Sequence, residues 1–177
     1  GTSVVYPYVT GAFPIPSYAS SKLYEETRHY FKSFAGILKK HCYPKGGIIA
    51  IQADNETCNF FRDQPYIMDY SEESVQQYHG FLEEKYKGIE NLNKTYHSKY
   101  KKFEEIYPPA GYQEGDENLE YYFDWLEYKE YQILEALRKM VEILEELELP
   151  IPIFHNCAYQ NYTPISVQRD EEIPGLS

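Results

Sequence analysis

The sequence has little cysteine and no long apolar run. Its three cysteines are an odd number in 177 residues and lack metal-ligand spacing, so neither a disulfide framework nor a zinc site is indicated. No apolar run approaches the roughly 20 residues that a membrane-spanning helix needs. The first residues also lack the basic and apolar stretches of a secretory signal. Free thiols favour a cytoplasmic location, with secretion left open as an alternative.

Positive charge is also scarce. The chain has 17 Lys and Arg residues against 28 Asp and Glu residues, which gives a formal net charge of −11. Nucleic acids and anionic membranes would be repelled by this surface, and we therefore expect neither as a partner. A neutral or cationic substrate fits the charge better.

Aromatic residues are abundant, at 17% of the chain with 20 tyrosines. Two interpretations are open. Tyrosine rings fill a core while their hydroxyls reach polar partners, or they bind a ring-shaped ligand. The core interpretation is favoured, and we apply it also to Trp125, which we expect to face the protein interior rather than a sugar.

Apolar spacing and helix-capping signals predict four helices and two short strands. The first 19 residues, rich in Pro, Gly and Ser, are predicted to form an ordered loop. The expected helices span residues 20–40, 71–86, 89–96 and 119–148, and the expected strands span residues 48–52 and 151–156.

The two predicted strands indicate an α/β fold. Both strands are apolar on both faces, as in parallel sheets that helices cover, and helices connect them along the chain. Two strands cannot bury themselves. We therefore interpret residues 1–177 as a single segment of a larger α/β domain.

Polar residues lie at the carboxyl ends of both predicted strands. Asp54, Asn55 and Glu56 come shortly after the first strand, and His155 and Asn156 are the last residues of the second. In parallel α/β folds, ligands bind at the carboxyl ends of the strands. The alternative is that these carboxylates only cap the loop or face water.

An Asn–Glu pair at such a strand end suits glycoside hydrolysis. The leaving oxygen of a glycoside needs a proton, which a carboxylic acid can supply near neutral pH when a sheltered position raises its pKa. The neighbouring amide can hydrogen-bond the sugar at its 2-position, a contact that strengthens in the transition state. The pattern therefore predicts a sheltered sugar pocket around this pair.

Several segments resemble glycoside hydrolase families 35 and 42, the β-galactosidase-like enzymes. "GGIIAIQADNE" resembles the fourth-strand motif of these families, and "PSYASSKLYEETRHYFKSFAGILKKH" is similar to the helix that precedes it. "FLEEKYKGIENLN" is typical of the insertion that follows, and "IPIFHN" is similar to the fifth strand. The resemblance implies a partial TIM (β/α)8 barrel, from roughly the third helix to the fifth strand and its following loop.

The resemblance also implies roles for individual residues. In a retaining exo-β-glycosidase of β-galactosidase type, Glu56 matches the catalytic acid/base and Asn55 matches the amide that contacts the 2-position. His155 and Asn156, at the rim of the same site, are expected to bind substrate. The nucleophile of these families lies on the seventh strand and has no match here, so the isolated chain is expected to be inactive.

Some features depart from the family pattern or stay open. Thr57 and Cys58 replace the commoner Tyr-Gly after the Asn–Glu pair, which alters the wall beside the acid. Arg62, Tyr66 and Tyr70 either rim the sugar pocket or pack within their own loop. Glu171 and Glu172 precede the sixth strand and are not assigned the nucleophile's role.

The expected partners are a carbohydrate with a terminal β-linked hexose and the remainder of the barrel. No cofactor and no catalytic metal are expected. Three alternatives stay open: an exo-β-glucosaminidase of the same family, a related hydrolase with an endo preference, and a non-catalytic carbohydrate-binding or assembly module.

Overall fold

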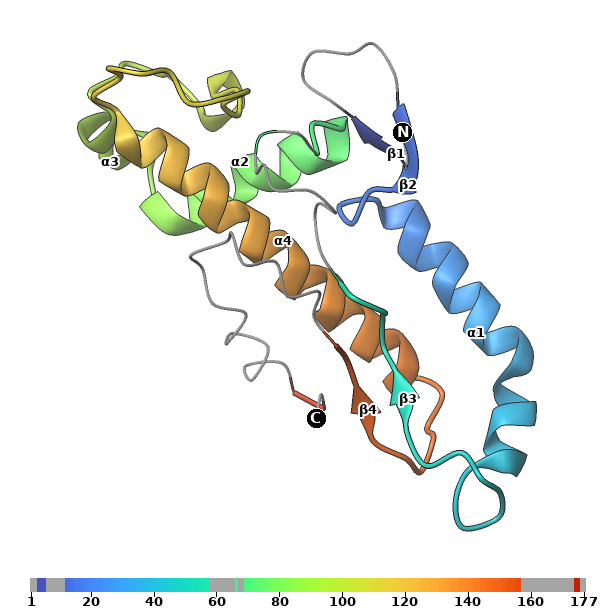
Figure 1. Cartoon of the computed structure of the whole chain (residues 1–177). Helices are drawn as coiled ribbons and strands as arrows, with labels where there is room; N and C mark the ends of the chain where they lie inside the picture. Colours follow the sequence, from blue (N-terminus) through green and yellow to red (C-terminus); the bar gives the residue numbers. More distant parts are fainter. Residues whose placement is uncertain (1–2, 6–11, 58–65, 67–68, 157–173, 176–177) are drawn as a thin grey trace. The chain divides into compact units, whose positions relative to one another are not determined.

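The computed structural model describes residues 3–5, 12–57, 66, 69–156 and 174–175. It forms two compact units, which we call unit 1 (residues 1–20 and 59–132) and unit 2 (residues 21–58 and 133–177). No helix in the described ranges is both long enough and apolar enough to cross a membrane. In chain order (Figure 1) the elements are β1 (Ser3–Val5), β2 (Ala12–Pro16), α1 (Ser21–His41), β3 (Ile51–Gln52), α2 (Glu72–Tyr86), α3 (Ile89–Tyr96), the 3-10 turn η1 (Phe103–Glu105), α4 (Leu119–Glu145) and β4 (Ile153–Phe154).

The four predicted helices are confirmed with small shifts at their ends. The hydroxyl of Ser71 accepts the backbone N–H of Ser74 and caps α2, as the sequence predicts. Helix α4 ends at Glu145, three residues before the expected end. Local signals therefore fix the helices well.

The prediction of a loop for the first 19 residues is wrong in two places. Strands β1 and β2 pair antiparallel there, with Ser3 opposite Pro16 and Val5 opposite Ala12. Proline normally argues against a strand because it has no N–H to donate to a neighbouring strand. In a two-stranded sheet each strand keeps an unpaired edge, and a proline there costs no ladder hydrogen bond.

Unit 2 contains the parallel pair that the sequence predicts. Ile51 pairs with Ile153 and Gln52 with Phe154, and the two strands run in the same direction. The N–H of Ala53 continues the ladder with a 2.8 Å bond to the carbonyl of Phe154. Each regular strand has only two residues, so the predicted spans 48–52 and 151–156 are too long. Residues 59–132, which belong to unit 1, are inserted between β3 and β4.

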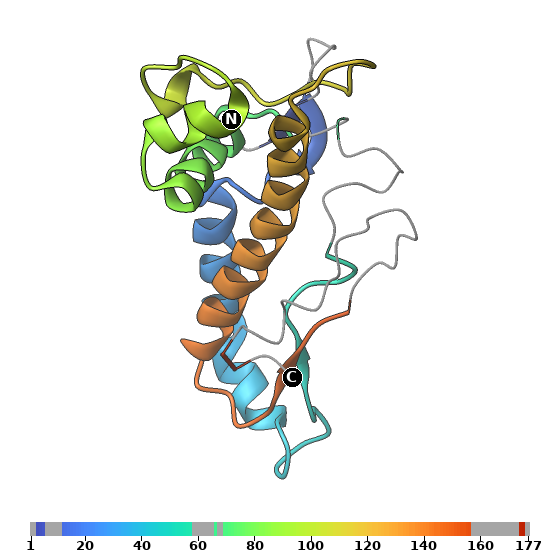
Figure 2. The same ribbon diagram turned by 90° about the vertical axis from the view of Figure 1, so that its left-hand side faces the viewer.

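Two helical segments of unit 2 lie beside each other, α1 and the last turns of α4 (Figure 2). Residues later in α1 contact residues later in the sequence at the end of α4. The ammonium of Lys139 lies 4.8 Å from the ring centroid of Tyr24, and Arg28 and Lys32 both pair with Glu146 at 2.9 and 2.8 Å. The helices therefore run parallel, as successive helices of a β/α repeat do.

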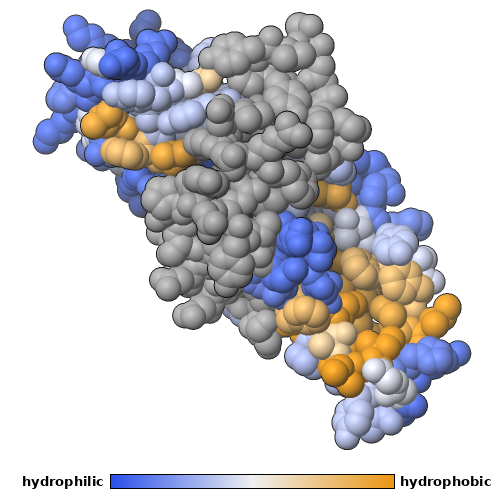
Figure 3. Space-filling model, viewed as in Figure 1, coloured by the Kyte–Doolittle hydropathy of each residue, from blue (hydrophilic) through white to orange (hydrophobic). Residues whose placement is uncertain are grey.

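Unit 2 also exposes apolar side chains near β3 (Figure 3). Ile49, Tyr43 and Ile37 are 71%, 64% and 61% exposed. The first strand segment, which the sequence shows to be apolar on both faces, is therefore not covered on both faces by the described residues.

Unit 1 is built around aromatic rings. Trp125, Tyr78 and Tyr128 are fully buried. The Trp125 ring lies 5.1 Å from that of Tyr78 and 5.2 Å from that of Tyr128, between centroids. The prediction that Trp125 belongs to the core is confirmed. Much of the tyrosine content serves the same core, since Tyr96 is buried in it and Tyr70, Tyr86 and Tyr121 pack against it.

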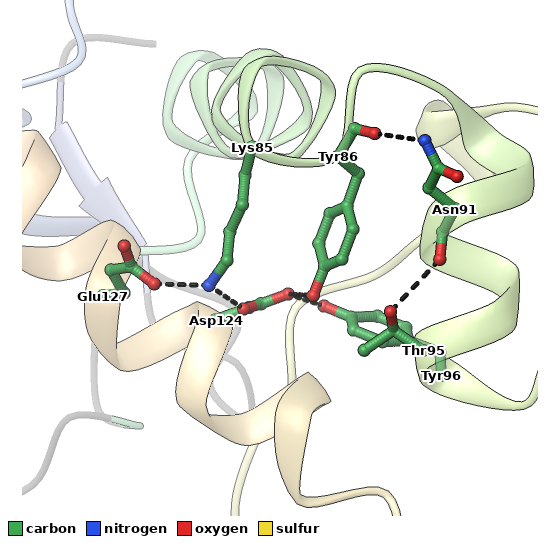
Figure 4. A network of polar contacts seen from close by, with 7 residues as sticks. All are labelled: Lys85, Tyr86, Asn91, Thr95, Tyr96, Asp124 and Glu127. Atoms are coloured by element: carbon green, nitrogen blue, oxygen red, sulfur yellow. Dashed lines mark hydrogen bonds and ion pairs between the residues drawn. The ribbon is translucent and has the colours of Figure 1, made fainter.

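A buried carboxylate ties three helices of unit 1 together (Figure 4). Asp124 of α4 has no exposed surface. It accepts hydrogen bonds from Lys85 of α2 at 2.7 Å, from the Tyr86 hydroxyl at 2.7 Å and from the Tyr96 hydroxyl of α3 at 2.5 Å. Lys85 also pairs with Glu127, at the half-exposed edge of the network. Three donors from two helices therefore share one buried acceptor, Asp124.

Lys129 is an unusual core residue of unit 1. It is 4% exposed, and its ammonium lies 3.9 Å from the ring centroid of Trp125. Burial lowers the pKa of Lys129 to about 7, and the nearby charge of Asp69 acts in the opposite direction. The folded protein therefore binds this proton less readily than the unfolded chain does.

We predict that Lys129→Met removes a pH dependence of stability. As the pH falls from above 10 to about 7, unfolded chains take up a proton at residue 129 while folded chains do not, so the native protein loses stability over this window. Below about 7 both states are protonated and the loss levels off. One pKa unit corresponds to about 1.4 kcal/mol, so the methionine variant should gain up to a few kcal/mol over the native chain at neutral pH.

Urea unfolding of both proteins between pH 6 and 10 measures this effect. The gain of the Lys129→Met variant should be larger at pH 7 than at pH 10. A gain that is constant with pH would show that the Lys129 side chain titrates normally.

Candidate active site

The polar residues that follow the two parallel strands meet in unit 2. The backbone N–H of Glu56, after β3, donates a 2.9 Å hydrogen bond to Oδ1 of Asn156, after β4. Since the strands are parallel and in register, their carboxyl ends meet at one edge of the pair. The structure thus brings together two of the residues that the sequence singles out.

Asp54 shapes the loop after β3 rather than pointing away from it. Its Oδ1 accepts the N–H of Asn55 at 2.9 Å, and its Oδ2 accepts the hydroxyl of Thr57 at 3.2 Å. Thr57 is buried and Asp54 is half-buried. Bonds of this kind between an aspartate and its own following backbone are typical of tight turns. Asp54 therefore holds the turn that carries Asn55 and Glu56.

Gln52 was not among the residues predicted for the site. Its Nε2 donates to the carbonyl of Asp54 at 2.9 Å and to Oδ1 of Asn55 at 3.3 Å. The same nitrogen lies in close contact with Oδ1 of Asn156. The signal for it is present in the sequence, because Gln52 is the only polar residue in the apolar stretch 48–53.

The position of Glu56 differs from the expectation in one respect. Its side chain is exposed, and so is that of Asn55. The sheltered pocket that the sequence predicts around this pair is therefore not formed by the described residues alone. The backbone of Glu56 has a φ of 52°, in the left-handed region that non-glycine residues seldom adopt.

The other residues considered for the site divide into three groups. His155 is half-buried and Asn156 exposed at the end of β4. Tyr70 belongs to the aromatic core of unit 1, where its ring centroid lies 5.1 Å from that of Trp125, and its hydroxyl donates to the carbonyl of Tyr66 at 3.1 Å. Outside the described residues lie Cys58, Arg62, Glu171 and Glu172.

Metal-ligating side chains do not gather in the described part of the chain. Within it, no group of three or more His, Cys, Asp and Glu residues is placed to hold a metal ion. Carboxylates, amides and a threonine hydroxyl make up the polar groups around Glu56. Such a set can donate and accept protons and hydrogen-bond a polyhydroxylated ligand.

Comparison with known protein families adds to this geometry. The model of a β-galactosidase family, glycoside hydrolase family 42, matches residues 16–172, which include both strand ends. The chain belongs to glycoside hydrolase family 42. This membership confirms the resemblance found in the sequence and places a glycoside hydrolase segment around the Asn55–Glu56 turn.

Solved structures of family 42 and related enzymes share the fold of the chain. The β-galactosidase of Halorubrum lacusprofundi superposes with a TM-score of 0.71 at 17% identity, over 97% of this chain and 26% of that enzyme. The β-galactosidase of Bacillus circulans sp. alkalophilus gives a TM-score of 0.68 at 18% identity, over 88% and 23%. These neighbours are TIM-barrel glycosidases, and the mixed helix and strand structure of the chain is consistent with part of such a barrel.

A curated relative carries a different name. The β-1,2-glucosyltransferase of Ignavibacterium album is 28% identical over 116 residues, which cover 65% of this chain and 16% of that protein. Together the comparisons show that this family 42 chain spans about a quarter or less of the length of these relatives.

Proposed function

We propose that the chain supplies the acid/base part of the active site of a retaining exo-β-glycosidase of β-galactosidase type. The observation that carries the proposal is the turn after β3. There Asn55 and Glu56 follow a parallel strand, and the backbone of Glu56 is bonded to Asn156 of the neighbouring strand end. In a family 42 chain, this is the place where an acid/base is expected.

The proposed reaction has two steps. In the first, the Glu56 carboxylic acid gives its proton to the glycosidic oxygen as that bond breaks, while a second carboxylate about 5 Å away bonds to the anomeric carbon. In the second, the Glu56 carboxylate takes a proton from water, and the water oxygen displaces the enzyme carboxylate. Asn55 hydrogen-bonds the sugar at its 2-position throughout.

The rest of the barrel completes the site in this proposal. A general acid works near neutral pH when its surroundings are sheltered, whereas Glu56 is exposed within this chain. Further barrel segments would wall the pocket and supply the nucleophile. We accordingly propose that residues 1–177 are an incomplete domain, from about the third helix to the fifth strand, and that they are inactive in isolation.

Hydrolysis by the enzyme that contains this chain and the remaining barrel tests the proposal. Nitrophenyl β-galactoside, β-glucosaminide and β-glucoside are compared, and NMR identifies the anomer that is released first. We expect the galactoside to be preferred and the β-anomer to appear first, since two displacements retain the configuration. Preference for the glucosaminide would favour the exo-β-glucosaminidase alternative, and release of the α-anomer would overturn the retaining mechanism.

A second candidate function is transfer to a sugar rather than to water. It is favoured by the similarity to a protein named β-1,2-glucosyltransferase. In the second step a sugar hydroxyl would replace water, with Glu56 removing its proton, and the chemistry is otherwise unchanged. Product analysis with added glucose or galactose as acceptor separates the two functions, because a transferase forms more disaccharide than free sugar.

A further inference from the structure

Among the described non-glycine residues with a left-handed backbone, Glu56 differs from the others in its setting. Lys87, His97 and Glu148 are the other non-glycine residues with positive φ. Lys87 and His97 are the C-caps of α2 and α3, and Glu148 lies in the turn after α4, where its N–H bonds to Glu145. This conformation is common where helices end. At Glu56 no helix ends, so this unfavourable backbone conformation needs another source of support.

Two side-chain amides provide such support. Oδ1 of Asn156 accepts the N–H of Glu56 at 2.9 Å, and the same oxygen is in close contact with Nε2 of Gln52. Gln52 also donates to the Asp54 carbonyl at 2.9 Å and to Oδ1 of Asn55 at 3.3 Å. Asp54 and Asn55, the two residues before Glu56, are thus linked through one amide nitrogen to Asn156 at the end of the neighbouring strand.

We propose that Gln52 and Asn156 are positioning residues for Glu56. They hold its backbone in the left-handed conformation and so fix the direction in which its carboxyl leaves the turn. The inference rests on the proposed acid/base role of Glu56. It also gives Asn156 a different part from the substrate contact expected from the sequence, because its amide oxygen serves two protein donors.

The side chain at residue 52 must donate hydrogen bonds to fill this role. Three oxygen acceptors surround Nε2 of Gln52, so an isosteric glutamate there would place a carboxylate oxygen against them. We expect Gln52→Glu to lower kcat/KM by about 10–100-fold near neutral pH, the order of loss that a misplaced catalytic group causes. At acidic pH the introduced carboxyl can hold a proton and donate one bond, and the loss should shrink.

Comparing substrates with different leaving groups distinguishes a positioning role of Gln52 from a general loss of structure in the variant. An alkyl β-galactoside needs the proton from Glu56, whereas a dinitrophenyl leaving group departs largely without it. In the complete enzyme, Gln52→Glu should lower kcat/KM for the alkyl substrate by 10-fold or more but change the dinitrophenyl substrate by about 3-fold or less. Gln76→Glu, a matched change at an exposed glutamine of α2, should alter neither.

Glu56→Gln, measured in parallel, distinguishes failure of the positioning role of Gln52 from failure of the acid/base role of Glu56. If Glu56→Gln shows the dependence on leaving group and Gln52→Glu does not, the positioning role is wrong and the acid/base role stands. If neither variant shows it, both are overturned. Equal losses for both substrates in Gln52→Glu would also contradict positioning, because unfolding removes every activity alike.

Hydrogen exchange gives a second readout that does not depend on activity. The amide of Glu56 should exchange slowly while Asn156 accepts it, as followed by mass spectrometry of peptides covering residues 52–57. Asn156→Leu removes the acceptor and should speed exchange by at least about 10-fold, whereas Asn156→Asp keeps an acceptor oxygen and should not. Unchanged exchange in Asn156→Leu would rule out the bond as a support of the turn.

Discussion

Glu56→Gln is expected to lower kcat/KM for an alkyl β-galactoside by about 10²–10⁴-fold in the complete enzyme, which is the usual contribution of general acid catalysis. Glutamine keeps the shape of the side chain but cannot give up the proton that the leaving oxygen needs. A dinitrophenyl galactoside, whose leaving group is stable as an anion, should lose far less. Steady-state kinetics with a series of leaving groups measures the difference.

Glu142→Gln is the matched control for this variant. Glu142 is an exposed glutamate of α4 in the same unit, and its replacement changes the net charge by the same amount. It should leave both substrates unaffected. A loss in Glu56→Gln that is equal for all leaving groups would point to binding or folding and would contradict the acid role.

The second large effect is expected at the buried carboxylate of unit 1. Asp124→Ala should lower the free energy of unfolding by about 3–5 kcal/mol, the usual cost of breaking a buried ion pair. The change leaves the Lys85 ammonium and the hydroxyls of Tyr86 and Tyr96 without their shared acceptor. Burial is the main reason that the pKa of both tyrosines is raised. The Asp124 carboxylate raises the pKa of Tyr86 further, and Tyr78 followed by Asp124 raises that of Tyr96, so both hydroxyls remain donors across the neutral range.

Glu127→Ala provides the comparison for Asp124→Ala. Glu127 pairs with the same lysine from the same helix, but its side chain is 35% exposed, and exposed pairs contribute about 1 kcal/mol or less. Trp125 is the only tryptophan of the chain and is fully buried in unit 1, so its fluorescence during urea unfolding reports on this unit. Equal losses in the two variants would mean that the network does not depend on burial.

The helices could be predicted from the sequence because their signals are local. Ser71 marks the start of α2, and Gly88 separates α2 from α3. Pro150, soon after α4, prevents the helix from continuing. Strand lengths could not be predicted in this way. Regular pairing depends on the partner strand, and an apolar run from Ile48 gives no sign that only Ile51 and Gln52 pair regularly.

The candidate site was predictable in its position but not in its detail. A parallel pair places Glu56 and Asn156 at the same edge, and the polar residues after each strand indicate it. The part played by Gln52 depends on the register of Ile51 with Ile153, which brings Gln52 within reach of Asn156. No local pattern specifies that register or the left-handed backbone at Glu56.

The most direct test of the acid/base role is rescue by azide. In Glu56→Ala, a dinitrophenyl β-galactoside still forms the covalent intermediate, but no base activates water to release it. Azide needs no base and can enter on the face that Glu56 occupied, so turnover should rise with azide concentration and NMR should identify β-galactosyl azide. Absence of an azide product, or an α-azide of the kind that a missing nucleophile produces, would contradict the role proposed for Glu56.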